Sequence, residues 1–590
     1  AARVAPGGGA IAPRTLGIAA VASAIGLAAA LIAEVLTHSL ALVTNLAFFH
    51  RWSFEDASPA DNRLGGWVVL VPVAGALLVG LMARYGSKAI RGHGIPEAME
   101  QVLFNESRIP ARVLFMKPLS AVVSIGTGGP FGAEGPIIAT GGALGSLVGQ
   151  FAKITAEERK ILLACGAAAG MSATFGAPLA AVVLAVELLL FEFSARALIP
   201  LVVATSVAGG VHAALYSSGP LFSVPARSYS GLGALPAFAI LGIAAGLLGV
   251  VITRGLFTVE SLYRRLPVSE FWHPVIGAAA FACVGLIEPR ALGVGYDAID
   301  DVLNSRLALG TVAVLGAVKL VAWWLALGSG TSGGTLAPIL LISASAGTLV
   351  GAGLNQLIPG AHVSVGAFAV VAMAATFGAS TRATFTAIVF VFELTRDYQI
   401  VLPLMLATVI ADLVFSALSD DSIMTEKLTR RGLRIGRHYG IDPMTTARIG
   451  TIMTPDVATL THDLTISQAR DLFLTKGHGA YPVVDDTGAL LGMIGRRELL
   501  SGDLDPTSSI SAITTSEVLS VGPGDHAIDQ KAFQHPVGHR PTDPAAQHRR
   551  DRLDTLHERR RPGKHGLKHH KQHRRQNQQA PQRVQQQRIQ

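Results

Sequence analysis

The sequence predicts an all-α polytopic membrane protein that carries a small α/β domain near its C-terminus. Three observations lead to this fold class. Half of the residues are apolar and only 15% are charged, and several apolar runs reach the roughly 20 residues that cross a bilayer. Short sequence blocks recur in the two halves of the apolar region. From about residue 440 onward, the composition becomes that of a soluble domain.

Composition divides the chain into five predicted parts. The first apolar run, 16–49, is too long for a signal peptide and predicts a tilted membrane helix. The basic cluster KLTRRGLRIGRH at 427–438 closes the membrane region and predicts that this end is cytoplasmic. The parts are an N-terminal segment (1–13), a membrane domain (14–432), a linker (433–450), an α/β domain (451–530) and a tail (531–590).

Many apolar segments of the membrane domain are shorter than a full span or are interrupted by Gly and Pro, as in 94–106, 135–151 and 336–355. Broken helices are tolerated at membrane depth only where they are buried in protein or line a wet cavity. Because they occur in both halves of the chain, they predict a central binding site.

The stretch GTGGPFGAEGPIIATGG at 126–142 places one carboxylate, Glu134, among glycines. Pro136 suits the first turn of a helix, and the run that follows predicts that helix. Free N–H groups and partial positive charge at a helix start favour an anion. We therefore expect an anion site here, with the Glu134 carboxylate placed where the anion would sit, and an ionisable residue at membrane depth predicts function.

An internal repeat relates the two halves. ATFGA at 173–177 returns at 375–379, and the same offset of 202 places Lys117 on Lys319 and Pro136 on Pro338. Several matches at one offset indicate duplication. The alternative, that helices rich in small residues resemble one another by chance, stays open. At least one of the two lysines is expected to be architectural.

The α/β domain is expected to alternate strands and helices. VATL, YPVVD and LLGMIG predict short buried strands, and DTG predicts a turn. A second copy starts near residue 510, because Asp463, Ile466 and Gln468 return as Asp525, Ile528 and Gln530. This copy is incomplete, since it stops at about residue 530.

The tail accounts for the net positive charge. Residues 531–590 hold 15 Lys and Arg and 4 Asp and Glu, with too few apolar residues to bury a core, which predicts disorder. One hypothesis is that the tail is read in a non-native frame. The alternative hypothesis is that this tail binds nucleic acid or anionic lipid. The expectation that we retain is that the chain has no nucleic-acid partner.

These motifs resemble the CLC chloride channels and chloride/proton antiporters. GHGIPE at 92–97, GAEGP at 132–136 and GTLAP at 334–338 are similar to three signature stretches of that family, over roughly 14–432. Residues 446–500 resemble a CBS domain. The resemblance implies two inverted repeats of tilted and broken helices, a homodimer in the lipid bilayer, and one anion path in each subunit.

The resemblance also implies the residues of that path. Glu134 matches the gating glutamate, whose carboxylate occupies an anion site and leaves it to admit chloride. Lys117 and Leu188 are expected to lie beside the path. The residues expected to contact the anion are His93, Gly94, Ile95, Gly132, Ala133, Gly135, Thr335, Leu336 and Met424.

Three positions depart from the family pattern. His93 replaces a chloride-coordinating serine; it either donates to the anion or only shapes its loop. Met424 replaces a pore tyrosine and offers no hydroxyl. Leu188 replaces the internal proton glutamate of the antiporters. Its neighbour Glu187 points about 100° away on a helix, so Glu187 is expected to be structural, opposite its repeat mate Glu393.

The sequence thus predicts channel-like transport of chloride or another small anion, gated by Glu134. The alternative is proton-coupled chloride antiport. No enzyme activity is expected, because HExxH and paired intramembrane aspartates do not occur in the sequence. No metal and no cofactor is expected to be required. A ligand sensor that binds an adenine nucleotide between two CBS copies is a third hypothesis, which the incomplete second copy disfavours.

Overall fold

A computed structural model describes residues 13–516 and 518, apart from 153, 217–218, 223–231, 359–362, 430–448, 455–456, 477 and 500–503. The predicted segment 1–13, except Pro13, most of the linker and the tail 531–590 therefore lie outside the described residues. The chain forms two units, 1–441 and 442–590, and each is described by itself.

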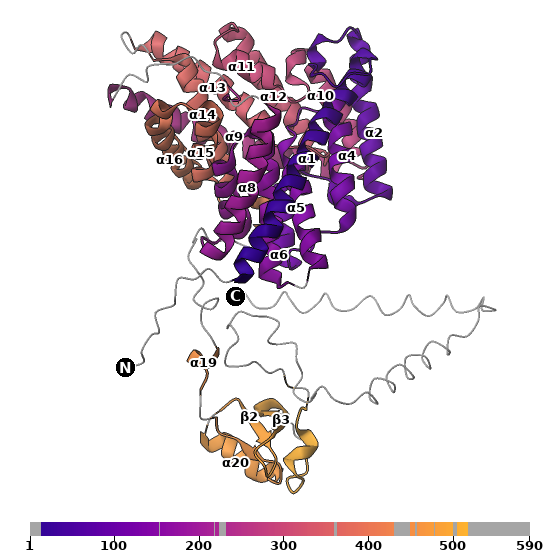
Figure 1. Ribbon diagram of the computed structural model, residues 1–590, viewed down its shortest axis with the longest axis vertical. Coiled ribbons are helices and arrows are strands. Elements are labelled where there is room, and N and C mark those ends of the chain that lie inside the picture. Colours follow the sequence, from indigo (N-terminus) through magenta and orange to yellow (C-terminus); the bar gives the residue numbers. More distant parts are fainter. Residues whose placement is uncertain are drawn as a thin grey trace, which may run out of the picture. The chain divides into compact units, whose positions relative to one another are not determined.

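The first unit is a bundle of helices of unequal length (Figure 1). Seven helical segments of the described residues are long and apolar enough to cross a membrane. The helices of the first half are α1 (Pro13–Phe49), α2 (Leu70–Tyr85), α3 (Ile95–Phe104), α4 (Ala111–Gly126), α5 (Glu134–Phe151), α6 (Ala156–Phe175), α7 (Pro178–Ala185) and α8 (Ala195–Leu215).

The second half repeats this order of long and short helices. The same offset that relates the sequence blocks also relates the starts of α5 and α13, at Glu134 and Leu336. The helices are α9 (Leu235–Arg265), α10 (His273–Gly285), α11 (Tyr296–Leu303), α12 (Leu309–Gly328), α13 (Leu336–Leu357), α14 (Val365–Thr381), α15 (Thr384–Thr395) and α16 (Val401–Leu418), followed by the short α17 (Glu426–Thr429).

Packing between neighbours is also repeated. Helix α1 runs obliquely beside α8 (Figure 1), and α9 packs on α16 in the same way. Helices α5 and α6 pack together as α13 and α14 do. Every residue of α14 from Gly366 to Thr381 is buried, so this apolar helix is surrounded by protein rather than by lipid. The short and broken helices predicted from sequence therefore lie inside the unit, where their ends can be satisfied.

Helices α7 and α15 join the two halves through reciprocal caps. Glu187, in the single π-helical turn η4 (Val186–Leu190) after α7, accepts hydrogen bonds from the Phe385 and Thr386 amides at 3.2 and 2.9 Å. Glu393, near the end of α15, accepts from the Leu179 and Ala180 amides at 3.1 and 2.7 Å. The structural role predicted for Glu187 is confirmed by these bonds.

The second unit holds a three-stranded sheet in the order β1 (Leu460–Thr461), β2 (Ala480–Val484) and β3 (Leu490–Gly495). Strands β1 and β2 are parallel, and β2 and β3 are antiparallel. Helix α20 (Ile466–Lys476) packs its Phe473 against Tyr481 of β2, with ring centroids 4.6 Å apart. The short helices α19 (Ile449–Ile452) and α21 (Arg496–Leu499) and the 3-10 helix η8 (Ile510–Ile513) also belong to this unit.

One expectation for this unit needs correction. The strand predicted at VATL is only Leu460–Thr461, because the residues before it pair with no neighbouring strand in the described sheet. The segment predicted to start a second copy is described only in part: Ile510 is fully buried, and Thr515 pairs with Met493 beside β3. Asp525, Ile528 and Gln530 lie outside the described residues.

Candidate functional site

Three glycine-rich loops meet in the middle of the membrane unit. Gly132 and Gly334 exchange backbone hydrogen bonds of 3.3 and 2.8 Å in an antiparallel bridge. Gly92 pairs in parallel with Ser332. Gly94, with φ at +97°, begins α3 against the Gly135 carbonyl, which a Cβ at Gly94 would approach to 2.4 Å. Only glycine permits this backbone conformation and this contact together.

The loops bring the starts of α3, α5 and α13 to one place. Gly94, Ala133 and Thr335 are the residues that precede the first turns of these helices. Each helix start carries partial positive charge and free N–H groups, so three of them together favour a small anion. Nine of the sequence-predicted residues lie in these loops and first turns: His93, Gly94, Ile95, Gly132, Ala133, Glu134, Gly135, Thr335 and Leu336.

Glu134 is the first residue of α5, and only 1% of its surface is exposed. Its carboxylate lies over Gly132, where a Cβ would come within 1.7 Å of Oε2, and it also faces Gly334. Oε1 accepts a hydrogen bond from the Tyr296 hydroxyl. Within the described residues, Oε2 has no hydrogen-bond partner. A buried carboxylate oxygen without a hydrogen-bond partner is rare in folded proteins and requires a cause other than packing.

Tyr296 was missed in the sequence analysis. It is the first residue of α11 and follows Gly295, whose φ is +85°. The signal that could have found it is the repeated pattern GxG before a short helix, GHGIPE at 92–97 and GVGYDA at 293–298. In the first copy the residue after the second glycine is Ile95, and in the second copy it is Tyr296. The repeat therefore places Tyr296 at the start of a helix that corresponds to α3.

Both repeat lysines hold the loop that leads to such a helix. The Lys117 ammonium donates to the carbonyls of Ile90 and Gly92, both at 2.8 Å. The Lys319 ammonium donates to the carbonyls of Ala291, Gly293 and Val294 at 3.0, 2.8 and 3.3 Å. The prediction that at least one lysine is architectural is confirmed, and the bonds extend it to both.

Helix α3 is also fixed from outside. The Glu97 carboxylate accepts from the Gly94 amide at 2.7 Å and pairs with the Lys427 ammonium at 2.8 Å. This pair ties the short α17 to the start of α3. Met424 is fully buried just before α17, next to Ile423, which lines a cavity together with His93. Met424 thus lies at the end of the site that carries His93.

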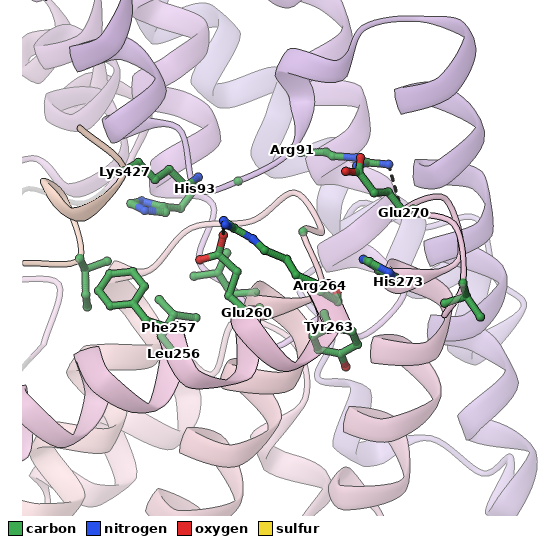
Figure 2. A pocket seen from close by; sticks show the side chains of 17 residues that line it. Arg91, His93, Leu256, Phe257, Glu260, Tyr263, Arg264, Glu270, His273 and Lys427 are labelled. Carbon is green, nitrogen blue, oxygen red and sulfur yellow. Dashed lines mark hydrogen bonds and ion pairs between the residues drawn. The ribbon is translucent and has the colours of Figure 1, made fainter. Parts of the chain in front are cut away.

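That cavity has a volume of about 390 Å³. Figure 2 shows the side chains of His93 and Lys427 beside it, with Arg91 paired to Glu270 at its other end. Glu260 and Arg264 of α9 form a second ion pair on its wall. His93 is 4% exposed, and its Nδ1 has no partner within the described residues. A polar, charged cavity thus reaches His93, which lies just before the start of α3.

Leu188 lies in the π-helical turn η4 and is 4% exposed. Its neighbour Glu187 is committed to the cap of α15. The position where antiporters of the family are expected to hold a proton-carrying glutamate is therefore apolar, and the adjacent carboxylate faces elsewhere. In the described part of the folded chain, no neighbouring carboxylate takes the place of the glutamate that Leu188 replaces.

The membrane unit is similar in sequence to a known family of proteins. Residues 74–416 match the family described as "Voltage gated chloride channel". The chain belongs to the CLC family. Residues 449–505 match the CBS domain. The chain is thus an integral membrane protein of a family that transports anions, and its soluble unit is a CBS domain.

Two relatives and one solved structure show how similar this chain is to other proteins of the family. A ClcB-like protein of Ralstonia nicotianae (strain ATCC BAA-1114 / GMI1000) is 30% identical over 366 residues, which cover 61% of this chain and 85% of that protein. The H(+)/Cl(-) exchange transporter ClcA of Salmonella arizonae is 32% identical over 374 residues, covering 60% and 78%. The structure of a slow cyanobacterial Cl-/H+ antiporter has a TM-score of 0.64 and 27% identity, covering 72% of this chain and 99% of that one.

Proposed function

We propose that the chain exchanges chloride for protons across a membrane, with Glu134 serving both as the gate of the anion path and as the proton carrier. The observation that carries the proposal is the buried Glu134 carboxylate at the meeting point of the α5 and α13 starts. An anion and a carboxylate cannot occupy one set of helix starts together. The names of the Salmonella and cyanobacterial relatives state H+/Cl− exchange and support exchange over conduction, whereas the Ralstonia relative is named a chloride channel protein.

In the proposed cycle, the charged Glu134 side chain closes the path because it takes the place of the anion. Protonation removes the charge that the helix starts stabilise, so the neutral side chain leaves and chloride enters. When Glu134 releases its proton on the other side and returns, the anion is displaced. Each return of the Glu134 carboxylate thus couples the release of a proton to the displacement of a chloride ion.

The inner proton route is the unusual part of this proposal. Leu188 carries no proton, and Glu187 is held by the α15 amides at 3.2 and 2.9 Å. Protons are therefore proposed to enter through the cavity lined by His93 and Glu260. A neutral imidazole can accept a proton at one ring nitrogen while it releases one from the other, and water in a polar cavity supplies the remaining links.

Channel-like conduction, the first expectation from sequence, is the second candidate. The apolar Leu188, the occupied Glu187 and the thioether of Met424 favour it, because all three lack a mobile proton at the inner end of the path. For both candidate functions we also propose that the chain forms a homodimer, as the family resemblance implies. Chemical crosslinking in the membrane would measure it.

Flux with simultaneous pH recording separates the two candidates. The chain is reconstituted into proteoliposomes with a chloride gradient, no pH gradient and the membrane potential clamped with potassium and valinomycin. Exchange drives protons uphill in a fixed ratio to chloride. Chloride movement with no change in external pH would replace exchange by conduction. The Glu134→Gln variant is the control, because it should move chloride without moving protons.

A further inference from the structure

The Tyr296 hydroxyl reaches the pore carboxylate from the second half of the chain. It donates a hydrogen bond to Oε1 of Glu134, 162 residues away in sequence. Within the described part of the chain, no other hydrogen bond of this hydroxyl is found. The hydroxyl therefore does nothing for the packing of α11 that a phenylalanine ring would not do.

Three elements fix where that hydroxyl lies. The ring meets Phe175, at the end of α6, and Phe222 edge-on, with centroids 6.4 Å away in both pairs. Edge-to-face contacts of this kind restrict ring orientation. The backbone before the ring is held by Lys319, which binds the carbonyls of residues 291, 293 and 294. Tyr296 is therefore presented to Glu134 in a fixed position.

Charged and titratable groups around the carboxylate are few. Among the described residues, those that face Glu134 are the Tyr296 phenol on α11 and the Lys319 ammonium on α12. Asp297, also on α11, faces Lys319 in turn. The Lys319 ammonium donates its hydrogen bonds to backbone carbonyls and acts on Glu134 only through the electrostatic attraction of its charge. The tyrosine is thus the side chain that contacts the carboxylate directly.

We propose that Tyr296 is a latch for the pore glutamate: its hydroxyl stabilises the charged Glu134 side chain in the closing position and so sets the acidity at which the path opens. The inference rests on the proposed role of Glu134 as the gate. A hydrogen bond to a charged group in a buried site is stronger than one between neutral groups. Protonation of Oε1 weakens the bond, and the latch then releases the neutral side chain.

The repeat supports this role. Lys117 and Lys319 hold equivalent loops, and each loop begins a short helix, α3 or α11. In the first copy, the residue that begins the helix is Ile95, which is apolar and cannot hold a carboxylate. In the second copy the residue is Tyr296. The same scaffold therefore delivers a hydroxyl to Glu134 from one side only.

The test removes the hydroxyl and keeps the ring. Anion efflux of Tyr296→Phe is measured in proteoliposomes at a series of pH values that are equal on both sides. Loss of a hydrogen bond that favours the charged form makes protonation easier, so the midpoint of acid activation moves upward by about one pH unit. The maximal flux stays the same, because the neutral side chain needs no latch. Size-exclusion elution of the purified variant verifies its fold.

A matched control is Tyr216→Phe. Tyr216 also donates to a glutamate, Glu34, at 2.6 Å, but this pair is exposed and lies outside the glycine loops. Its loss should leave the midpoint unchanged. An equal shift in Tyr216→Phe would overturn the latch, because the effect would then be general.

The second arm places Tyr296→Phe in a Glu134→Ala background. With the carboxylate gone, the single and double variants should have the same flux at every pH. A further change on adding Tyr296→Phe would mean that the tyrosine acts on the path itself, and the latch would be wrong. If Tyr296→Phe has the wild-type midpoint of acid activation while the flux of Glu134→Ala does not depend on pH, the latch is rejected. The role of Glu134 as the gate is then retained. A Glu134→Ala variant with the wild-type pH profile rejects both.

Discussion

Glu187 and Glu393 each hydrogen-bond the first turn of the helix that leads to the other. Two glutamates that occupy equivalent places in the repeat thus join the two halves of the chain by one shared device. Because a carboxylate at a helix start satisfies orphan amides and complements the helix dipole, each contact stabilises both halves at their junction.

Removing these caps should lower stability without abolishing transport. We expect Glu187→Ala and Glu393→Ala each to reduce the free energy of unfolding by about 1–2 kcal/mol, as loss of a helix cap does. Thermal unfolding in detergent measures the change, with Glu55→Ala, an exposed loop glutamate, as the control. Glu187→Gln keeps an acceptor oxygen and should retain the wild-type ratio of proton to chloride movement. A variant that lost this ratio while keeping its stability would make Glu187 a proton carrier.

Glu134→Gln should mimic the protonated gate. An amide carries no charge, so the starts of α5 and α13 no longer hold it in place of the anion. Chloride efflux at pH 7 should rise to the level that the wild type reaches in acid, and it should no longer change with pH. A chloride electrode and proteoliposomes suffice for the measurement. If the variant kept the acid activation of the wild type, another group would be the gate.

Bromide should locate the anion path in a crystal. The heavier halide should replace chloride between the loops that carry Gly132 and Gly334, near the starts of α5 and α13. Its occupancy should be higher in Glu134→Ala, because the carboxylate no longer competes for the helix starts. Anomalous diffraction at the bromine edge gives the position. Bromide bound only on the exterior of the protein would contradict the assigned path.

The two buried lysines should be equally indispensable for folding. Lys319→Met leaves three buried carbonyls without their donor, and Lys117→Met leaves two. Each unsatisfied buried group costs about 1–3 kcal/mol, so both variants should unfold well below the wild type. Lys160→Met on α6 is the control. Equal thermal midpoints for all four proteins would mean that these loops hold their shape without the lysines.

The CBS domain offers a prediction for pH. The Thr487 hydroxyl and the Ala489 and Thr487 amides hold the pKa of Asp485 below its usual value. A depressed pKa means that this turn gains stability above the unfolded pKa and loses it as the pH falls through the folded one. Hydrogen exchange of residues 485–489 in the full chain, corrected for intrinsic rates, should show protection falling below about pH 4. Asp485→Asn, which keeps an acceptor but cannot ionise, should remove this dependence.

Much of the anion site was accessible from sequence because glycine, proline and one carboxylate are informative locally. The loops at 92–97, 132–136 and 334–338 each carry their own turn and helix-start signals, so their residues could be named before their contacts were known. The similar sequences that end in Glu187 and Glu393 also identified these two residues as a pair. Glu134 could be singled out because its charge is exceptional among apolar neighbours.

Tyr296 could not be found in this way because its importance comes from a contact. The repeated GxG pattern marks Tyr296 as the start of a short helix, but nothing in the local sequence shows that its hydroxyl meets Glu134. Only the fold brings it to Glu134. Whether residues 510–515 begin a second CBS copy stays a prediction, because most of the residues that would complete that copy lie outside the described part of the chain.

The paired lysine-held loops have a further consequence for how this path acquired a direction. A duplicated unit gives two identical halves, and an ancestor made of identical halves would treat both faces of the membrane alike. In this chain the loops held by Lys117 and Lys319 still share their anchoring bonds, but one begins its helix with Ile95 and the other with Tyr296. Because Glu134 in the first half and Tyr296 in the second have the apolar mates Leu336 and Ile95, the two halves of the path no longer present the same groups.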